Sequence, residues 1–283
     1  MDLTDAQLFK GLTERGLKLP PQPRVVEDLQ KCRLRKEKDL RVVARVISQD
    51  AGIVALLFRA VQSSAYHEYP PFRSIEDIIH AIGIDRVFNL VQAIALATGT
   101  MSRAQRKTYE HFWANSTAVA QLAMLVAKDR VTVCNVFPDE AYLAGIFHDC
   151  GIPLLMERFP AYCRKLDLDR QELWFSISEE DQCYQTDHSV VGYFVAKHWK
   201  LPTFICNAIR FHHDLERVSE HNERSLVAIL QMAIKLHCLS LHVVHQEWPD
   251  TRKLVLDELG LSEASFPEFS DEILERYNAL TAA

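Results

Sequence analysis

The segment AYLAGIFHDCGIP (residues 141–153) places a histidine and an aspartate, His148 and Asp149, at the end of an apolar run. A run of this kind is typical of a buried helix, so both side chains are expected where that helix ends. An imidazole beside a carboxylate suits a metal site. Two adjacent residues do not define such a site, and the rest of the sequence must supply further ligands.

Outward from this segment, almost every periodic stretch has the spacing of a helix. Residues 39–47 repeat apolar side chains at every third or fourth position, as an amphipathic helix does. Asp50 and Ser74 are placed to cap the helices after them, and Gly83 is placed to end one. The same helical spacing recurs at 86–97, 112–127, 139–149, 188–199, 202–212 and 225–244. No alternating run of strand length is bounded by turn residues, so we predict an all-α fold.

Proline-rich and polar stretches divide these helices into parts. The segment LPPQP (19–23) ends a leading helix, because successive prolines cannot continue one. The polar stretch at 99–107 separates two lobes, and QEWPD (246–250) begins a C-terminal appendix. The expected parts are a leading helix at 1–18, a central domain at 19–245 with lobes at 19–105 and 106–245, and a helical appendix at 246–283.

The charge of the 283 residues argues against one class of function. A net charge of -6 and a pI near 6.1 disfavour a dedicated nucleic-acid binder, whose phosphate contacts need clustered cations. The one basic stretch, at 31–45, is interrupted by Glu37 and Asp39. This pattern favours a solvated helix face over a nucleic-acid-binding patch.

Targeting and membrane signals are not found in the sequence. The N-terminal segment MDLTDAQLF is acidic and lacks the basic and apolar regions of a signal peptide. The longest apolar stretch, 225–244, carries Gln231 and Lys235, so a buried core helix is expected there rather than a membrane span. The 7 cysteines include no Cys-x-x-Cys pair, which favours reduced thiols. We therefore expect a cytoplasmic protein.

Three further histidines are placed where they could join the His148–Asp149 pair. His188 begins a predicted helix, and His212 and His213 end another. Because neighbouring residues on a helix point about 100° apart, a doublet at a helix end can direct both side chains at one ion. Imidazole nitrogen and carboxylate oxygen are ligands for Fe, Mn, Zn or Ni. These residues form a candidate metal site if the three helices converge.

Each candidate also has a simpler interpretation. A lone histidine near a helix end, such as His188, is more often a cap or a solvated group than a ligand. The doublet His212–His213 is open to either interpretation. Cys150, next to Asp149, is expected to be a small buried hydrophobe rather than a nucleophile. Spacing alone therefore gives a helical protein with a candidate histidine-rich site.

The order of these motifs resembles a known family. The HD pair with Gly151 after it, then DHSVVGYFVAKHWKLP (187–202) and AIRFHHD (208–214), is similar to the HD-domain superfamily of metal-dependent phosphohydrolases. Three N-terminal stretches resemble in particular its HDOD branch, the HD-related output domain of bacterial signalling proteins. They are LPPQPRVVEDL (19–29), VARVISQDAGIVALLFRAVQSSAY (43–66) and RSIEDIIHAIGIDRVFNLV (73–91). The resemblance covers residues 19–245 and implies an HD-like helical bundle behind an N-terminal helical lobe.

The sequence departs from the catalytic members of this superfamily at three positions. The resemblance implies a first metal histidine on the preceding helix, where Asn115 stands, and a final metal aspartate where Ile234 stands. His111, one helical turn before Asn115, is an alternative first ligand under a shifted alignment. Ile152 replaces a lysine that helps bind phosphate in the cyclic di-GMP phosphodiesterase branch.

These losses predict an incomplete metal site. The resemblance implies that Asp149, His188, His212 and His213 bind one ion. In the catalytic members, the other ion is bound by the HD pair together with the two residues that Asn115 and Ile234 replace here. We therefore expect one divalent ion (Fe, Mn, Ni or Zn) or none, with His148 as a further candidate ligand.

Two functional hypotheses are compatible with these residues, and the first is preferred. It is a non-catalytic or weakly catalytic bacterial signal-transduction module that binds a signalling protein or a small-molecule ligand, as a monomer or a homodimer, with no membrane or nucleic-acid partner. The alternative is a metal-dependent phosphohydrolase for a nucleotide or cyclic dinucleotide, in which His148 and Asp149 are catalytic. Nucleic-acid binding through residues 31–45 is the weakest hypothesis.

Overall fold

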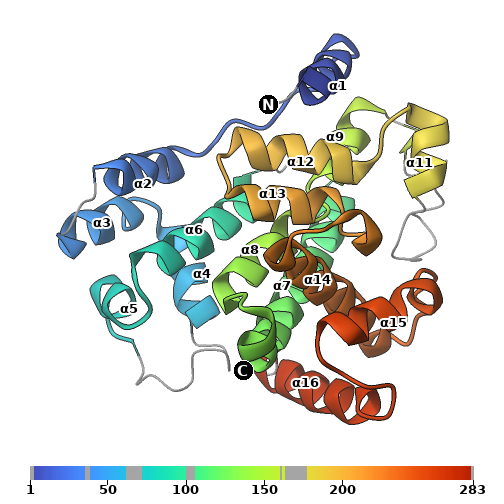
Figure 1. The fold of residues 1–283 in the computed structure, drawn as a ribbon. Helices are drawn as coiled ribbons and strands as arrows, with labels where there is room; N and C mark the ends of the chain where they lie inside the picture. The colour runs from blue at the N-terminus through green and yellow to red at the C-terminus, as the bar shows by residue number, and fades with distance from the viewer. Residues whose placement is uncertain are drawn as a thin grey trace.

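Helices are the only regular secondary structure in the described residues (Figure 1). The computed structural model describes residues 3–35, 39–61, 72–99, 106–159, 161–162 and 177–281, and no strand is present in these ranges. The all-α prediction is confirmed. Two predicted features fall partly outside the described residues: the polar break at 99–107, of which 100–105 are not described, and the basic stretch at 31–45, of which 36–38 are not described.

The described residues between 24 and 99 form short helices, and three of the helix ends lie at predicted capping residues. Asp50 Oδ1 accepts hydrogen bonds from the backbone of Gly52 and Ile53 at 3.0 and 3.1 Å. Ser74 forms a capping box with Asp77. Gly83 ends its helix with φ 92°, a conformation that side chains with a Cβ rarely adopt. The helices are α2 (Arg24–Leu34), α3 (Leu40–Ile47), α4 (Ala51–Val61), α5 (Ile75–Ile82) and α6 (Ile84–Gly99).

The leading helix is shorter than predicted. Helix α1 (Leu3–Glu14) ends before the prolines, because Gly16 turns the chain with φ 85°. An extended segment at 17–23 then leads to α2. Prolines therefore keep this connection extended, but a glycine ends the helix.

The centre of the molecule is the pair formed by α7 (Arg106–Cys134) and α8 (Pro138–Phe147), which also packs against α6. Gly145 permits this close packing, since a Cβ on it would lie 2.5 Å from Ala120 Cα. Helix α14 (His221–Ser240) covers α7, and its buried face confirms a core helix for most of the apolar stretch at 225–244. The last four residues of that stretch follow the helix, and Leu241 and Val244 among them are exposed. The HD pair follows α8 directly and therefore starts from the centre of the packed core.

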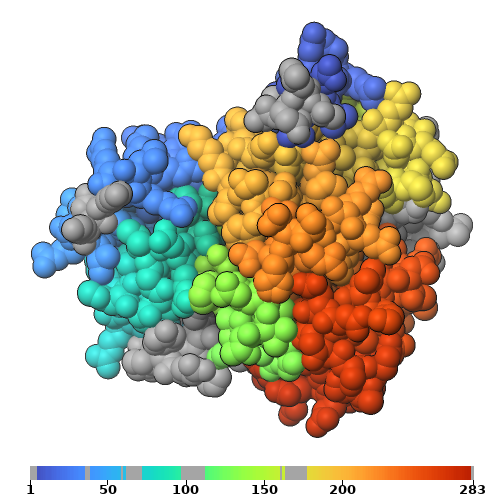
Figure 2. Space-filling model, in the orientation of Figure 1, coloured from blue at the N-terminus to red at the C-terminus, as the bar shows by residue number. Residues whose placement is uncertain are grey.

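Four shorter helices follow α8 in the chain: α9 (Gly151–Arg158), α11 (Ile177–Tyr184), α12 (His188–His198) and α13 (Thr203–Arg210). Helix α13 packs on α8, and α12 packs on α9 and α13. Beyond α14, helix α15 (Trp248–Glu258) packs on α14 and α16 (Phe266–Thr281) packs on α7. Figure 2 shows these C-terminal helices in one continuous surface with the segments before them. The predicted division of the chain at residue 245 stays a prediction.

Among the described residues, no single helix has both the length and the hydropathy needed to cross a membrane. The bent pair Ile75–Ile82 and Ile84–Leu96, with 120° between its halves, meets that requirement jointly by length and composition alone.

Candidate metal centre

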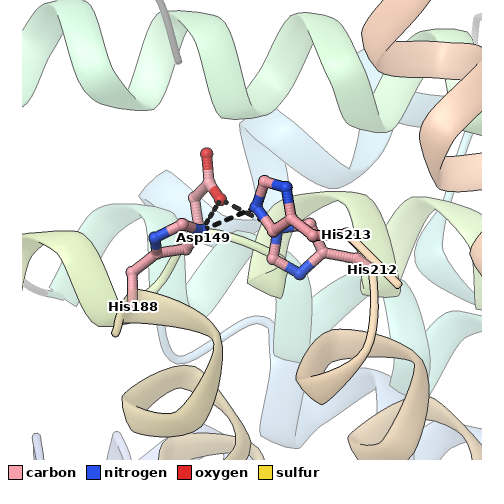
Figure 3. Close-up of side chains that lie close together, drawn as sticks. All are labelled: Asp149, His188, His212 and His213. Atoms are coloured by element: carbon pink, nitrogen blue, oxygen red, sulfur yellow. Dashed lines mark hydrogen bonds and ion pairs between the residues drawn. The ribbon is translucent and has the colours of Figure 1, made fainter. Parts of the chain in front are cut away.

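The structure brings together four of the predicted ligands from three helix ends (Figure 3). Asp149 follows α8, His188 begins α12, and His212 and His213 follow α13. One ligand atom from each lies within 4.8 Å of the other three. The convergence on which the candidate site depended is therefore present. That these residues bind a metal stays a prediction.

The contacts in this group converge on one carboxylate oxygen. Asp149 Oδ1 lies 3.3 Å from His188 Nε2 and 3.4 Å from His212 Nε2. His188 Nε2 lies 3.0 Å from His213 Nε2. Each histidine thus presents the same ring nitrogen to the centre of the group, as the ligands of a single ion would.

The opposite ring nitrogens of the doublet are held by acceptors. His212 Nδ1 donates to the Ile209 carbonyl at 2.7 Å, and His213 Nδ1 donates to Glu247 Oε2 at 2.8 Å. Because these oxygens can only accept, a neutral ring keeps its proton on Nδ1 and its lone pair on Nε2. Within the described residues, the buried His212 Nε2 makes no hydrogen bond, which is the condition that a bound cation would relieve. The donor set therefore fits a divalent ion.

His188 is oriented by a carboxylate that the sequence did not single out. Glu180 is 0% exposed on α11, and its Oε2 accepts from both His188 Nδ1 and the His188 backbone N–H, at 2.7 and 2.8 Å. Tyr162 donates its hydroxyl to the other oxygen of Glu180. Such carboxylate–histidine pairs fix the ring orientation of metal ligands. Neither Glu180 nor Glu247 stands in a pattern that distinguishes it from nearby surface acids.

Close backbone packing sets the distance between Asp149 and His188. A Cβ on Gly151 would lie 2.1 Å from the His188 carbonyl oxygen and 2.9 Å from the Gly192 nitrogen. The start of α9 therefore touches the start of α12 at a position where only glycine fits. Cys150 is buried beside this contact, as expected for a small hydrophobe, and burial raises the pKa of its thiol well above the usual value.

His148 occupies the other side of the aspartate. Its side chain is 0% exposed, its Nδ1 donates to the Gly145 carbonyl at 2.6 Å, and its Nε2 lies 3.1 Å from Asp149 Oδ2. His148 thus contacts the carboxylate oxygen that faces away from His188 and His212. It lies outside the four-residue group and supports Asp149 within it.

Shifted pKa values determine which ligand atoms of the group are free to bind a cation. Burial acts to raise the pKa of Asp149, but the charge and hydrogen bond of His148 hold it well below the usual value. Burial and the charge of His213 lower the pKa of His212 to about 3, so His212 is neutral at pH 7. Burial acts to lower the pKa of His188, but the Glu180 carboxylate raises it to about 10. A metal ion would therefore displace a proton from His188 Nε2.

Asn115 and Ile234, the two positions interpreted as lost ligands, make other contacts in the structure. Asn115 Oδ1 lies 3.4 Å from His237 Nε2, on α7 and α14 respectively. Ile234 is 4% exposed and is part of the hydrophobic core. The side chain of His111, the alternative first ligand, lies outside the described residues.

The fold and this order of motifs have known counterparts. Residues 19–215 match the HDOD domain. The chain belongs to the HDOD family. The HDOD match ends at residue 215, before the predicted boundary at 245, and Glu247 lies beyond both.

Solved structures share the HDOD fold over nearly the whole chain. A Shewanella amazonensis protein, named as a candidate metal-dependent phosphohydrolase, is 20% identical and has a TM-score of 0.74, with 99% of this chain and 97% of that chain covered. An HDOD domain protein of unknown function from Geobacter sulfurreducens is 25% identical and has a TM-score of 0.67, with 98% and 96% covered. A candidate signal transduction protein from Marinobacter aquaeolei has a TM-score of 0.65 at 20% identity, with 99% and 64% covered.

A longer protein is also similar to this chain. An uncharacterized protein of Treponema pallidum (strain Nichols) is 22% identical over 232 residues, which are 81% of this chain and 44% of that protein. The chain therefore spans less than half the length of the curated relative it matches.

Replacing Glu180 with glutamine is expected to weaken metal binding. The amide keeps the size of the side chain, but it removes the charge that holds His188, and losses of about 10- to 100-fold in metal affinity are typical of such changes. Chelator competition with Zn²⁺ measures the effect. Glu179→Gln, at the exposed neighbouring position, is the matched control and should bind Zn²⁺ as the wild type does. Equal affinities of both variants would show that Glu180 does not support the metal centre.

Proposed function

We propose that the chain is a non-catalytic regulatory module of the HDOD type that binds one divalent metal ion through Asp149, His188, His212 and His213. Membership of the HDOD family supports a regulatory or phosphohydrolase-like role of the HD type. The bound ion would stabilise the module and shape the surface that it offers to a signalling protein or a small ligand.

The observation that carries this proposal is the single group of four ligand atoms within 4.8 Å. Each of its members is buried or nearly so, which favours tight binding over exchange with solvent. Three imidazoles and one carboxylate fill the four positions of a tetrahedral ion, as in structural sites. Fe, Mn, Ni and Zn all accept this donor set.

The lost positions argue for regulation rather than catalysis. Two-metal hydrolysis stabilises the attacking and leaving oxygens of a phosphate between two ions. Ile234 offers no ligand atom, and the Asn115 side chain offers only a neutral oxygen, which lies 3.4 Å from His237. A second ion would therefore have only His148 and Asp149 as strong ligands among the positions that the family resemblance assigns to it.

A phosphohydrolase is the second candidate function. The retained HD pair favours it, since His148 Nε2 lies 3.1 Å from Asp149 Oδ2. The name of the Shewanella protein, whose TM-score is 0.74, points the same way. In that case His148 and Asp149 would be the catalytic residues, and a nucleotide or cyclic dinucleotide the substrate.

Elemental analysis separates the two candidates. Protein purified without chelator is expected to carry about one equivalent of a divalent transition metal, and to leave bis(p-nitrophenyl) phosphate intact in the presence of Mn²⁺ or Ni²⁺. Two equivalents of metal, or hydrolysis that disappears in Asp149→Ala, would replace the regulatory proposal with the phosphohydrolase. No bound metal would contradict both.

A further inference from the structure

A buried carboxylate, Asp5, helps to anchor the leading helix α1 to the rest of the protein. Asp5 is 5% exposed. It accepts hydrogen bonds from the Tyr193 hydroxyl at 2.6 Å, Lys197 Nζ at 3.0 Å and Arg210 Nη1 at 2.8 Å. Burial acts to raise the pKa of Asp5, but these hydrogen bonds lower it to about 2. The docked helix therefore inserts a charged carboxylate between three donors.

Further contacts lie along α1 and at Arg15, the residue that follows it. The Phe9 ring lies 5.3 Å from the Phe194 ring, between centroids. At the C-terminal end, Arg15 donates to the Tyr184 carbonyl at 3.2 Å and to Gln185 Oε1 at 2.7 Å. In Figure 1, α1 lies outside α12, at the end of the extended segment that leads to α2. Leu12, near the end of α1, is 6% exposed and belongs to the hydrophobic core, so the attachment combines apolar packing with these polar contacts.

The segments that α1 contacts are the ones that carry the candidate metal centre. Tyr184 ends α11, which carries Glu180. Tyr193 and Lys197 lie on α12, which begins with the ligand His188. Arg210 ends α13, two residues before His212. One helix therefore holds together three segments that must converge for the four ligand atoms to meet.

We infer that α1 is a clamp on the metal centre, with Asp5 as its main positioning residue. This inference rests on the proposed metal binding. The docked helix favours the arrangement of α11, α12 and α13 in which the ligands converge. By thermodynamic linkage, a bound ion favours the docked helix by the same factor. A partner that displaces α1 would thereby loosen the metal, and metal loss would release α1.

Zn²⁺ affinity, measured by chelator competition, tests the effect of the helix on the metal. Asp5→Ala is expected to weaken Zn²⁺ binding about tenfold, within the usual range of coupling between sites. Glu14→Gln is the matched control, because Glu14 lies on the same helix in an exposed pair with Lys10 at 3.7 Å, and it should bind as the wild type does. Circular dichroism verifies that both variants are folded. If Asp5→Ala and the wild type bound Zn²⁺ equally tightly, the clamp would be overturned, while the proposed metal binding would stand.

Hydrogen exchange tests the effect of the bound metal on the docking of α1. This measurement uses the wild-type chain, so it remains possible even if Asp5→Ala fails to fold. Zn²⁺ is expected to slow amide exchange of residues 5–15 in the wild type and to leave it unchanged in His188→Ala. If the amide exchange rates of α1 in the wild type were the same with and without bound Zn²⁺, the clamp would be contradicted. A wild type that binds no Zn²⁺, Mn²⁺ or Ni²⁺ would overturn the proposed function and the clamp with it.

Discussion

Replacing Asp149 with alanine is expected to lower metal affinity at least about a hundredfold, more than the loss of an outer carboxylate costs. Asp149 is the only carboxylate in the four-residue group, and its Oδ1 lies 3.3 and 3.4 Å from two of the histidine nitrogens. Without it, three imidazoles converge with no negative charge between them. Isothermal titration with Zn²⁺ and elemental analysis of the purified variant measure the loss.

The adjacent sequence offers a control for this change. Asp214 follows His213 directly, but its side chain is 44% exposed and pairs with Arg217 at 3.0 Å. Asp214→Ala should therefore retain the metal. If both aspartate variants bound Zn²⁺ like the wild type, the ion would be held elsewhere and the geometry of Figure 3 would have another role.

Replacing Gly151 with alanine is expected to destabilise the protein by about 3 kcal/mol, at the upper end of overpacking costs. The new methyl group would meet backbone rather than a movable side chain, since its position is 2.1 Å from the His188 carbonyl oxygen. To admit it, α9 and α12 must separate, which moves His188 away from Asp149. Urea denaturation gives the change in the free energy of unfolding, and Zn²⁺ titration of the folded variant gives the effect on the site.

A second glycine tests whether the effect is local. Gly11 lies in α1, and a Cβ on it would meet nothing within 4 Å. Gly11→Ala is therefore expected to be neutral or to stabilise the protein by up to about 1 kcal/mol, because alanine favours a helix. Similar losses for both alanine variants would mean that the contact between α9 and α12 is not tight.

The helices could be predicted from the sequence because their causes are local. The spacing at 39–47 and the caps at Asp50 and Ser74 act within one or two turns, and the structure contains them as expected. The end of the leading helix was predicted wrongly, because the prolines at 19–23 are a stronger signal in the sequence than Gly16. Gly16 comes before the prolines in the chain, so its turn ends the helix before they can.

The candidate ligands could be identified in the sequence because their order along the chain resembles a family, whereas their supports could not. Glu180 and Glu247 act through single contacts with His188 and His213. Each contact joins segments whose meeting depends on the whole packed core, and neither acid has a periodic or capping signal of its own. The same is true of Asp5, which resembles any other acid in the first turn of a surface helix.

The hydrogen bond between His213 and Glu247 has a consequence for how the candidate metal centre is shared among relatives. All four candidate ligands lie within residues 19–215, the part shared with the HDOD family, while Glu247 lies 32 residues beyond that part's end (247 − 215). A relative that kept the family segment but carried a different C-terminal region would retain every ligand and lose the acceptor that orients one ring. The unit that would hold an ion at this site therefore extends beyond the family match, because Glu247 orients the His213 ring from outside it.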